Sequence, residues 1–485
     1  MNLQLSSTDY LSILPTTILA VAGMLVLLVD LALKPERKAA TAWLAFIGFV
    51  AAGAASLAIM DQRGFGFNNM IALDPYAQVL GLIAIVAGAF TVLTSINYVR
   101  DRGIGRSEYY ALLLFSVSGM VMMAAANNLI VVFVALELLS IPLYVLAGFA
   151  RPNVQSEEAA IKYFLLGAFA SGFLLFGVAL MYGAFGTTDL SAIVGKVTQL
   201  GTSPLALLGA GFVLVGLGFK VAAVPFHMWT PDVYEGAPTP ITGFMSVGAK
   251  AAGFAALLRV FVYSLGGIKA DWVTLVAIVS AITMIVGNVV AISQTNLKRM
   301  LAYSSIAHAG YILLGVASGN ETGVAGALFY LVAYTFTNVG AFAVLTAMAK
   351  QEGEEQTFQT YRGLYKRSPA LALMMMLFML SLTGIPLTGG FIGKYYLFLS
   401  AVQANLIWLA VIGVLTSVVS AFFYLRVIVD MFMRDAEPGH AEMPVNYRPL
   451  NWTVNLAALG VLVLGIIPTV ALPVIQLAAQ LLVGA

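Results

Sequence analysis

The sequence contains no cysteine and few charged residues. The absence of cysteine excludes disulfide bonds, cysteine-ligated zinc, iron–sulfur clusters and thiol catalysis within this chain. Only 9% of the 485 residues are charged, and the chain has 24 Lys and Arg and 22 Asp and Glu. It therefore lacks the excess of positive charge that binds nucleic acid, and nucleic-acid binding is set aside. Three dispersed histidines supply no haem or metal set, and the sequence lacks a P-loop and a glycine-rich dinucleotide fingerprint.

Apolar residues are abundant instead. They make up 61% of the chain, and the mean hydropathy is +0.95, more than a water-soluble surface accommodates. The chain is therefore expected to be a polytopic membrane protein. Its N-terminal stretch lacks the positive region of a signal peptide, and its apolar run is long enough to span a membrane, so we expect it to form the first helix.

Long apolar runs predict an all-α membrane protein with about fourteen transmembrane helices. Closed β-barrels are excluded because the runs are continuously apolar rather than alternating. The expected spans lie near residues 10–33, 40–60, 76–98, 108–126, 128–149, 157–184, 204–229, 238–263, 271–293, 297–317, 323–349, 369–402, 406–433 and 451–472.

Positive charges concentrate in alternate loops of this bundle. The even-numbered loops carry about three, whereas the odd-numbered loops carry about fifteen, and such loops lie on the cytoplasmic side. Both termini are therefore expected on the periplasmic side. The odd-numbered loops carry Lys34, Arg37, Lys38, Arg100, Arg102, Arg106, Arg151, Lys298, Arg299, Lys350, Arg362, Lys366, Arg367, Arg434 and Arg448.

An internal repeat appears when the sequence is displaced by about 161 to 168 residues. Asn128 then matches Asn296, and Pro225 matches Pro386. Because each unit has an odd number of spans, the two copies (helices 4 to 8 and helices 9 to 13) should be inverted, with the seventh and twelfth helices discontinuous. The expected divisions are N-terminal helices at 1–107, a first repeat at 108–263, a second repeat at 264–433, and a C-terminal loop and helix at 434–485.

Several titratable residues fall inside the expected helices. A lysine at the bilayer centre costs roughly 2.5 to 3.5 kcal/mol on insertion scales, so such groups should face protein or water and are functional candidates. They are Glu137, Lys162, Lys220, Lys250, His308 and Lys394, with His227 directly after the Pro225 break. Arg259 and Arg426 are the other cations within helices.

Glu137 and Lys220 predict an ion pair. Burial favours a neutral lysine and a protonated glutamate, whereas an opposite charge nearby does the reverse, so a pair whose distance changes can exchange protons. The alternative is a static pair that only fixes helix packing.

Other candidates also have two interpretations. Lys162 follows Glu158 by four residues and either joins a proton pathway or forms a helix-end ion pair. Lys394 either lies in the pathway or extends to the membrane surface. His227 and His308 either carry protons or serve as hydrogen-bonded packing residues. The segment 229–240 contains acidic residues, but its prolines and glycine predict a rigid turn without catalysis.

Three segments resemble a known family: VALELLSIPLYVL, GFKVAAVPFHMWTPDVYEGAPTPITGFMSVGAKAAGFAALLR and LSLTGIPLTGGFIGKYYLF. The chain is similar to the antiporter-like membrane subunits of proton-translocating NADH:quinone oxidoreductase, respiratory complex I. The resemblance covers nearly the whole chain. The chain stops soon after the fourteenth helix, so it is expected to lack the long lateral helix of the family's largest antiporter-like subunit. Its twelfth helix carries lysine rather than the glutamate typical of the middle one.

The resemblance implies roles for particular residues. Glu137 matches the family's fifth-helix glutamate, and Lys220 matches the seventh-helix lysine paired with it. Lys250 matches the eighth-helix lysine that leads to the centre, and Lys394 the twelfth-helix lysine on the exit side. His308 lies where the family has a polar link between halves, and Lys162 where some members have a further lysine.

The resemblance also implies partners and location. FMN, iron–sulfur clusters and quinone would be bound by partner subunits, which oxidise NADH, and this chain would bind no cofactor. Its partners would be neighbouring antiporter-like and small membrane subunits in a bacterial cytoplasmic (inner) membrane. The alternatives are a subunit of a multi-subunit Na+/H+ antiporter or of a membrane-bound hydrogenase, which share the fold, and a purely structural membrane scaffold.

Overall fold

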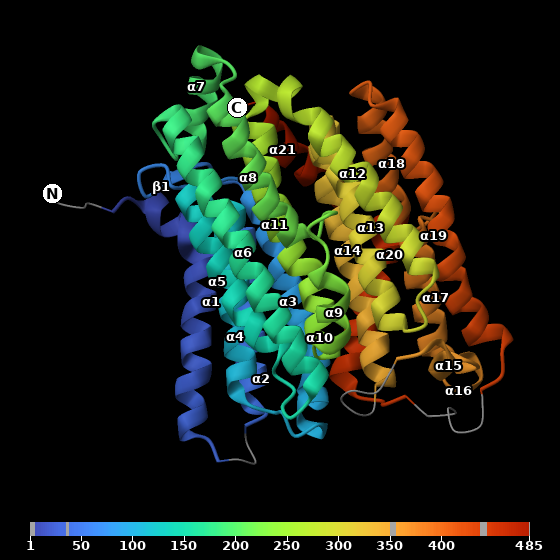
Figure 1. The fold of residues 1–485 in the computed structure, drawn as a ribbon. Helices are drawn as coiled ribbons and strands as arrows, with labels where there is room; N and C mark the ends of the chain where they lie inside the picture. The colour runs from blue at the N-terminus through green and yellow to red at the C-terminus, as the bar shows by residue number, and fades with distance from the viewer. Residues whose placement is uncertain (1–4, 35–37, 350–355, 437–443, 485) are drawn as a thin grey trace.

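The computed structural model describes residues 5–34, 38–349, 356–436 and 444–484, which form a tall bundle of helices (Figure 1). Arg37 and Lys350 lie outside the described residues. The α-helices are α1 (Ser7–Ala32), α2 (Ala40–Ala58), α3 (Pro75–Asp101), α4 (Ser107–Ala125), α5 (Leu129–Ala147), α6 (Val154–Phe185), α7 (Leu190–Leu200), α8 (Pro204–Val221), α9 (Trp229–Gly236), α10 (Thr239–Phe244), α11 (Lys250–Leu257), α12 (Lys269–Ile292), α13 (Leu297–Ser318), α14 (Glu321–Met348), α15 (Phe358–Tyr361), α16 (Leu364–Arg367), α17 (Pro369–Thr383), α18 (Gly389–Gln403), α19 (Ile407–Met433), α20 (Arg448–Ile466) and α21 (Leu472–Val483).

Shorter elements complete the fold. Two π-helical stretches, η2 (Met245–Ala249) and η3 (Leu258–Ser264), are continuous with α10 and α11. Two 3₁₀ turns are η4 (Gly266–Ile268) and η5 (Pro468–Val470), and the antiparallel strands β1 (Gly64–Gly66) and β2 (Ile71–Leu73) form a small hairpin.

Thirteen helices among the described residues are long and apolar enough to cross a membrane. One of them, Thr239–Ser264, combines α10, η2, α11 and η3. The fourteenth expected passage is the broken pair α17 and α18, each too short to span alone. The prediction of an all-α polytopic membrane protein with about fourteen passages is therefore confirmed.

Several elements were not expected from the sequence: the hairpin β1–β2 and the short helices α7, α9, α15, α16 and α21. The short runs that form β1 and β2 are too brief to carry a periodic signal. Helix α7 lies between two spans and buries Leu190, Ile193 and Val197, which recur at helical spacing. Helix α21 follows the Pro468 turn and packs against α3 and α14.

The two repeats contain an equivalent backbone bridge. Asn128, just before α5, pairs with Asp189, just before α7, and Asn296, just before α13, pairs with Thr357, just before α15. Both bridges therefore have the same sequence spacing. Both asparagines also cap their helices by accepting a hydrogen bond from a backbone N–H two residues on. The repeated sequence thus produces the same local structure twice.

The expected breaks occur in both repeats, and they are inverted. Helix α8 ends at Val221 and α9 begins at Trp229, whereas α17 ends at Thr383 and α18 begins at Gly389. In Figure 1, α8 lies above α9 but α17 lies below α18. This opposite order is what two inverted copies of one five-helix unit require.

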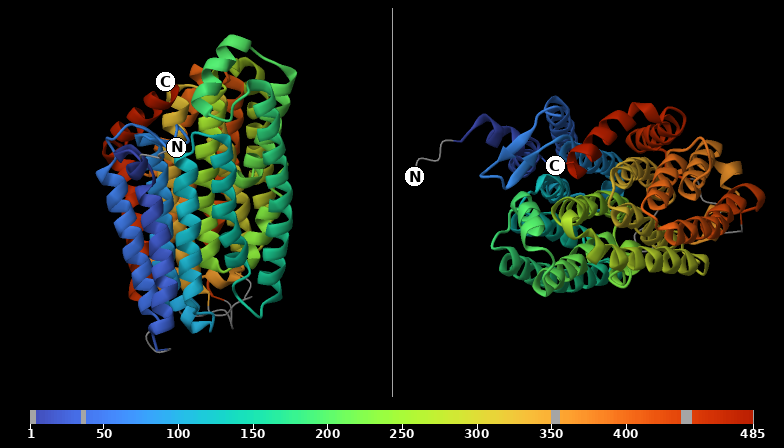
Figure 2. Two further views of the ribbon diagram at one scale, coloured as in Figure 1. Left: turned by 90° about the vertical axis from the view of Figure 1, so that its left-hand side faces the viewer. Right: turned by 90° about the horizontal axis from the view of Figure 1, so that it is seen from above.

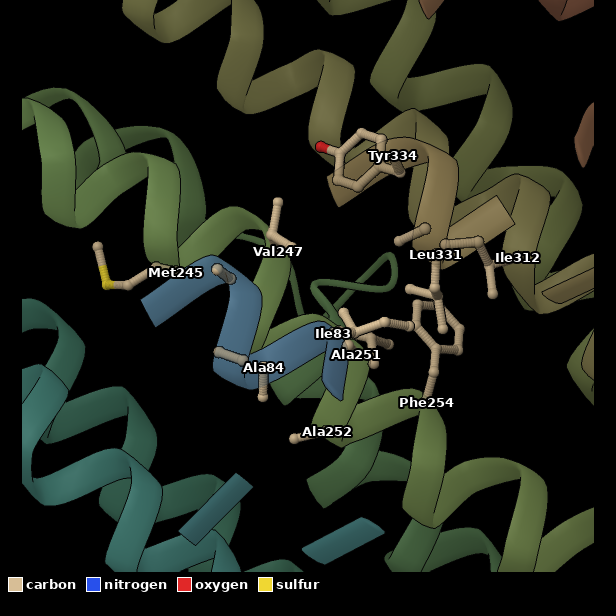
Figure 3. Packing of buried hydrophobic residues seen from close by; sticks show 14 of the residues in the cluster. Ile83, Ala84, Met245, Val247, Ala251, Ala252, Phe254, Ile312, Leu331 and Tyr334 are labelled. Atoms are coloured by element: carbon tan, nitrogen blue, oxygen red, sulfur yellow. The ribbon is translucent and has the colours of Figure 1, made fainter. Parts of the chain in front are cut away.

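The core lies where the repeats meet. Seen from above, they lie side by side, with α1–α3 and α20–α21 along one flank (Figure 2). The span Thr239–Ser264 is wholly buried, and α13 and α14 are nearly so. Side chains of α3, η2, α11, α13 and α14 pack together there (Figure 3). Polar groups in these helices must therefore find partners within the protein.

Candidate functional site

Lys220 lies in the last turn of α8, directly before the break. It is 2% exposed, and its amine donates to Ser140 Oγ of α5 at 2.8 Å and to the Tyr163 hydroxyl of α6 at 3.0 Å. The helix ends at Ala222, which has a φ of 62°, and the Ala223 N–H bonds back to the Gly218 carbonyl. The break thus leaves a buried amine between neutral oxygens of two other helices.

Glu137 lies one turn before Ser140 on α5 and is half-buried. Its carboxylate accepts a hydrogen bond from Ser171 of α6. The expected contact ion pair with Lys220 is not formed, and the two charges interact only at longer range. Glu137 and Ser140 are three residues apart and therefore lie on the same face of α5. On that face, Ser140 rather than Glu137 lies next to the Lys220 amine.

Lys250 lies directly after the π-helical stretch η2 and is 2% exposed. Its amine donates to the Ser305 carbonyl of α13 at 2.5 Å. Since α11 belongs to the first repeat and α13 to the second, this hydrogen bond crosses from one repeat to the other. Such π-helical stretches often occur at functional sites, because the wider turn shifts the side chains that follow.

His308 lies in α13, surrounded by tyrosines. The residue is 2% exposed, its Nδ1 bonds to the Tyr330 hydroxyl, and its Nε2 lies 2.9 Å from the Tyr424 hydroxyl. The Tyr424 hydroxyl also bonds to Ser304. Both ring nitrogens are therefore joined to hydroxyl groups that can donate or accept a proton.

Lys394 lies in α18 beside the second break and is 4% exposed. Its amine donates to the carbonyls of Leu382 and Thr383, both at 2.9 Å, and to Ser417 Oγ at 2.8 Å. It also lies 4.8 Å from the centroid of the Tyr311 ring, which packs against His308. The amine thus points into the protein rather than to the membrane surface.

Lys162 forms the expected pair with Glu158, at 2.7 Å, and a second pair with Asp232 of α9, also at 2.7 Å. Arg299 of α13 pairs with Asp232 at 2.9 Å and with Glu235 at 2.7 Å. The segment 229–236, predicted as part of a rigid turn, is instead the helix α9, and its acidic residues belong to an ion-pair cluster. A cavity of about 200 Å³ opens beside them.

His227 lies in the turn between α8 and α9 and is half-buried. Arg259 is tied to Asp74 at 3.0 Å and to the Ala124 carbonyl at 3.2 Å. Arg426 lies 4.1 Å from the centroid of the Phe358 ring. The structure therefore holds the two arginines in local contacts, apart from the chain of buried amines.

Several polar partners were missed by sequence reasoning. A serine or tyrosine in an apolar helix is common, and only spatial proximity shows that it bonds to a lysine or histidine. The spacing Glu137–Ser140 on one helix face was the one available signal. The missed partners are Ser140, Tyr163, Tyr330, Tyr424 and Ser417.

Within the described ranges, no cluster of three or more His, Asp or Glu has the geometry of a metal site. The buried groups Lys220, Lys250, His308 and Lys394 instead bond to hydroxyl or carbonyl oxygens.

The chain is similar to proteins of known type over nearly its full length. The family model described as NADH:quinone oxidoreductase/Mrp antiporter, TM, matches residues 126–420. NADH-quinone oxidoreductase subunit N of Trichlorobacter lovleyi is 48% identical over 97% of each chain. A chain of respiratory complex I from Thermus thermophilus with bound aureothin is 38% identical, with a TM-score of 0.81, covering 95% of this chain and 98% of that one.

A chain of the Mrp complex from Dietzia sp. DQ12-45-1b is 22% identical, with a TM-score of 0.85, covering 98% of this chain and 97% of that one, so the likeness shows a shared fold. The family match spans both breaks and the residues from Glu137 to Lys394. On the family match and the level of identity to these relatives, this chain belongs to the NADH:quinone oxidoreductase/Mrp antiporter family of transmembrane subunits.

Proposed function

We propose that this chain carries protons across the bacterial cytoplasmic membrane as subunit N of an NADH-quinone oxidoreductase. The relatives named subunit N support the assignment to this complex. The observation that carries the proposal is the series of buried amines, Lys220, Lys250 and Lys394, with His308 between the last two. Electron transfer from NADH to quinone would take place in partner subunits that hold FMN and iron–sulfur clusters.

Each residue has a distinct part in this proposal. Glu137 attracts the charge on Lys220 at longer range, and a buried amine gains proton affinity when a carboxylate approaches and loses it when the carboxylate withdraws. A proton released at Lys220 passes to Lys250, which contacts α13. His308 and its tyrosines then connect Lys250 with Lys394 beside the second break. Lys162 and His227 flank this series near the first break.

The proposal extends to the limits of the repeats and to orientation. Helices before residue 108 would form an N-terminal unit, residues 108–263 and 264–433 the two repeats, and residues 434–485 a C-terminal unit. The cations of the odd-numbered loops support a cytoplasmic position for those loops, so both termini would lie on the periplasmic side. Protons would then move outward, from the cytoplasm to the periplasm.

Proton flux in proteoliposomes that contain the assembled complex tests the proposal. The flux is divided by the rate of NADH oxidation with a soluble artificial acceptor, which reports the amount of complex. We expect Lys220→Ala, Lys250→Ala and Lys394→Ala each to lower this ratio at least tenfold, since each removes a link in a series. Lys196→Ala is the matched control, because Lys196 is exposed on α7.

The competing interpretation is a structural scaffold. It predicts that all three lysine variants, once assembled, keep the flux of the parent complex. Equal flux in Lys220→Ala and Lys196→Ala would therefore rule out the proposed transfer series.

A further inference from the structure

Helix α9 joins a charged cluster at one end to the Lys220 amine at the other. Its first residue, Trp229, is 2% exposed and lies within the protein. One turn further on, Asp232 and Glu235 form ion pairs with α6 and α13. The first turn and the second turn of this eight-residue helix thus contact different groups.

The contacts at the buried end lead directly to Lys220. The indole of Trp229 stacks on the ring of Tyr163, with centroids 4.4 Å apart and planes 9° from parallel. Its Nε1 donates to the Phe219 carbonyl at 3.1 Å, one residue before Lys220. The Tyr163 hydroxyl accepts the hydrogen bond from the Lys220 amine. Trp229 therefore holds both the end of α8 and the ring whose hydroxyl binds the amine.

The contacts at the other end come from both repeats. Lys162, the residue before Tyr163 on α6, donates to Asp232, and Arg299 of the second repeat donates to Asp232 and Glu235. The Asn296 side chain donates to Glu235 as well, at 3.1 Å. Two adjacent residues of α6 are thus involved: Lys162 binds Asp232, and Tyr163 binds Lys220.

These ion pairs are half-exposed, so we expect them to fix the position of α9 more than to stabilise the fold. Exposed pairs contribute about 0 to 1 kcal/mol each, because water screens the charges. Here, however, one arginine bonds to two carboxylates on successive positions of a helix face, and a network of this kind fixes a helix better than one pair does. The cavity of about 200 Å³ is lined by Lys162, Asp232, Glu235 and Arg299 of this cluster.

We propose that Trp229 and Tyr163 are positioning residues for the Lys220 amine, and that the ion pairs of Lys162, Asp232, Glu235 and Arg299 set their position through α9. The inference rests on the proposed function, in which Lys220 carries the proton. The second repeat, through Arg299, then acts on the proton carrier of the first repeat without touching it.

The test uses the assembled complex in proteoliposomes and the same ratio of proton flux to complex content. Tyr163→Phe removes the hydroxyl and keeps the ring that stacks on Trp229. Asp232→Asn removes the charge at nearly constant size. We expect each to lower the flux about three- to tenfold, the change that follows from losing one hydrogen bond of ordinary net strength. Asp232→Glu keeps the charge, and it should restore at least half of the flux that Asp232→Asn loses.

Two controls match these variants. Tyr110→Phe removes the hydroxyl of another buried tyrosine of the first repeat, and Asp61→Asn neutralises an exposed aspartate in the loop before β1. Both should keep the parent flux. If the ion pairs act through the hydroxyl, the double variant Tyr163→Phe/Asp232→Asn should have the flux of Tyr163→Phe alone.

The outcomes separate the two proposals. Parent flux in Tyr163→Phe would overturn the positioning role even if Lys220→Ala loses its flux, and the proposed function would stand. A double variant whose loss equals the product of the single losses would overturn the link through α9. Full flux in Lys220→Ala, measured in parallel, would overturn the proposed function itself.

Discussion

Lys394 completes the end of a helix. The carbonyls of Leu382 and Thr383 belong to the last turn of α17, where no further helical N–H is available to bind them. The Lys394 amine donates to both, and Gly384, with a φ of 89°, turns the chain away directly beneath it. A cation beside a helix C-terminus is also favoured by the helix dipole. The Lys394 side chain thus caps the end of α17 and also belongs to the proposed proton path.

Replacing this lysine should therefore destabilise the fold. Lys394→Met keeps the length of the side chain but leaves the buried Leu382 carbonyl without its donor and the Thr383 carbonyl with the Ser417 hydroxyl alone. We expect a loss of about 1–3 kcal/mol in the free energy of unfolding, the cost of an unpaired buried polar group. Thermal unfolding of the purified chain in detergent measures it. Lys196→Met on α7 is the control, and an equal melting temperature for the two variants would contradict the capping role.

Asp232 gives a pH prediction at the same scale. Partial burial raises its pKa, but hydrogen bonds and charge from Lys162 and Arg299 outweigh this and hold the pKa below its usual value. Because the folded pKa is depressed, the stabilisation is fully present above the unfolded pKa of about 3.9 and is lost as the pH falls through the folded value. The ion pairs should therefore persist unchanged from about pH 8 to about pH 5.

The difference in melting temperature between the parent chain and Asp232→Asn measures this effect. It should be constant over that range and should shrink only below about pH 4. A difference that shrinks between about pH 8 and about pH 6 would instead assign the titration to another group.

At the scale of elements, the second break depends on glycine. A Cβ on Gly390 of α18 would lie 2.0 Å from the Ser381 carbonyl oxygen of α17, and a Cβ on Gly393 would lie 2.5 Å from the Tyr330 ring. At Gly390, α18 thus lies closer to the backbone of α17 than any residue with a Cβ would allow. This closeness places Lys394 within reach of the carbonyls at the end of α17.

Gly390→Ala should therefore separate the halves. Overpacking against a backbone atom should lower the free energy of unfolding by about 1–3 kcal/mol or more. Because Lys394 would be displaced, the proton flux of the variant complex should fall as well. The matched control is Gly211→Ala on α8, where nothing lies within 4 Å of the added methyl group. It should be neutral or stabilising by up to about 1 kcal/mol, because alanine favours helix. Melting temperature and flux of both variants decide the matter, and equal values for both would refute the close approach as the cause.

The sequence predicted these breaks but not their internal geometry. Pro225 and Pro386 interrupt apolar runs at matching positions, which is a signal that a single sequence can carry. The π-helical stretches around Lys250 and Arg259 have no such signal, because they follow from packing inside a wholly buried span. The same holds for Tyr163 and Ser140: their partner, Lys220, comes from a distant part of the chain.

At the scale of the whole molecule, inversion of the repeats places the halves of the two broken helices in opposite order, and in the proposed function it joins the two breaks into one path (Figure 1). The lysine of the first break lies before it, on α8, and that of the second lies after it, on α18. Between them, the bond from Lys250 to Ser305 and the tyrosines of His308 run through the shared core. The buried amines and the histidine of both repeats therefore lie inside the bundle.

The proposed orientation rests on the charges of the loops, and it is testable because the chain has no cysteine. Asp61 lies in the loop between α2 and β1, and Gly105 lies in the loop between α3 and α4, at the opposite end of α3; both are exposed. Arginines flank the second loop, so we expect it on the cytoplasmic side. A membrane-impermeant thiol reagent should then label Asp61→Cys in right-side-out vesicles and Gly105→Cys in inverted vesicles. The reverse pattern would place both termini in the cytoplasm, and outward-moving protons would then pass along the proposed series in the opposite order.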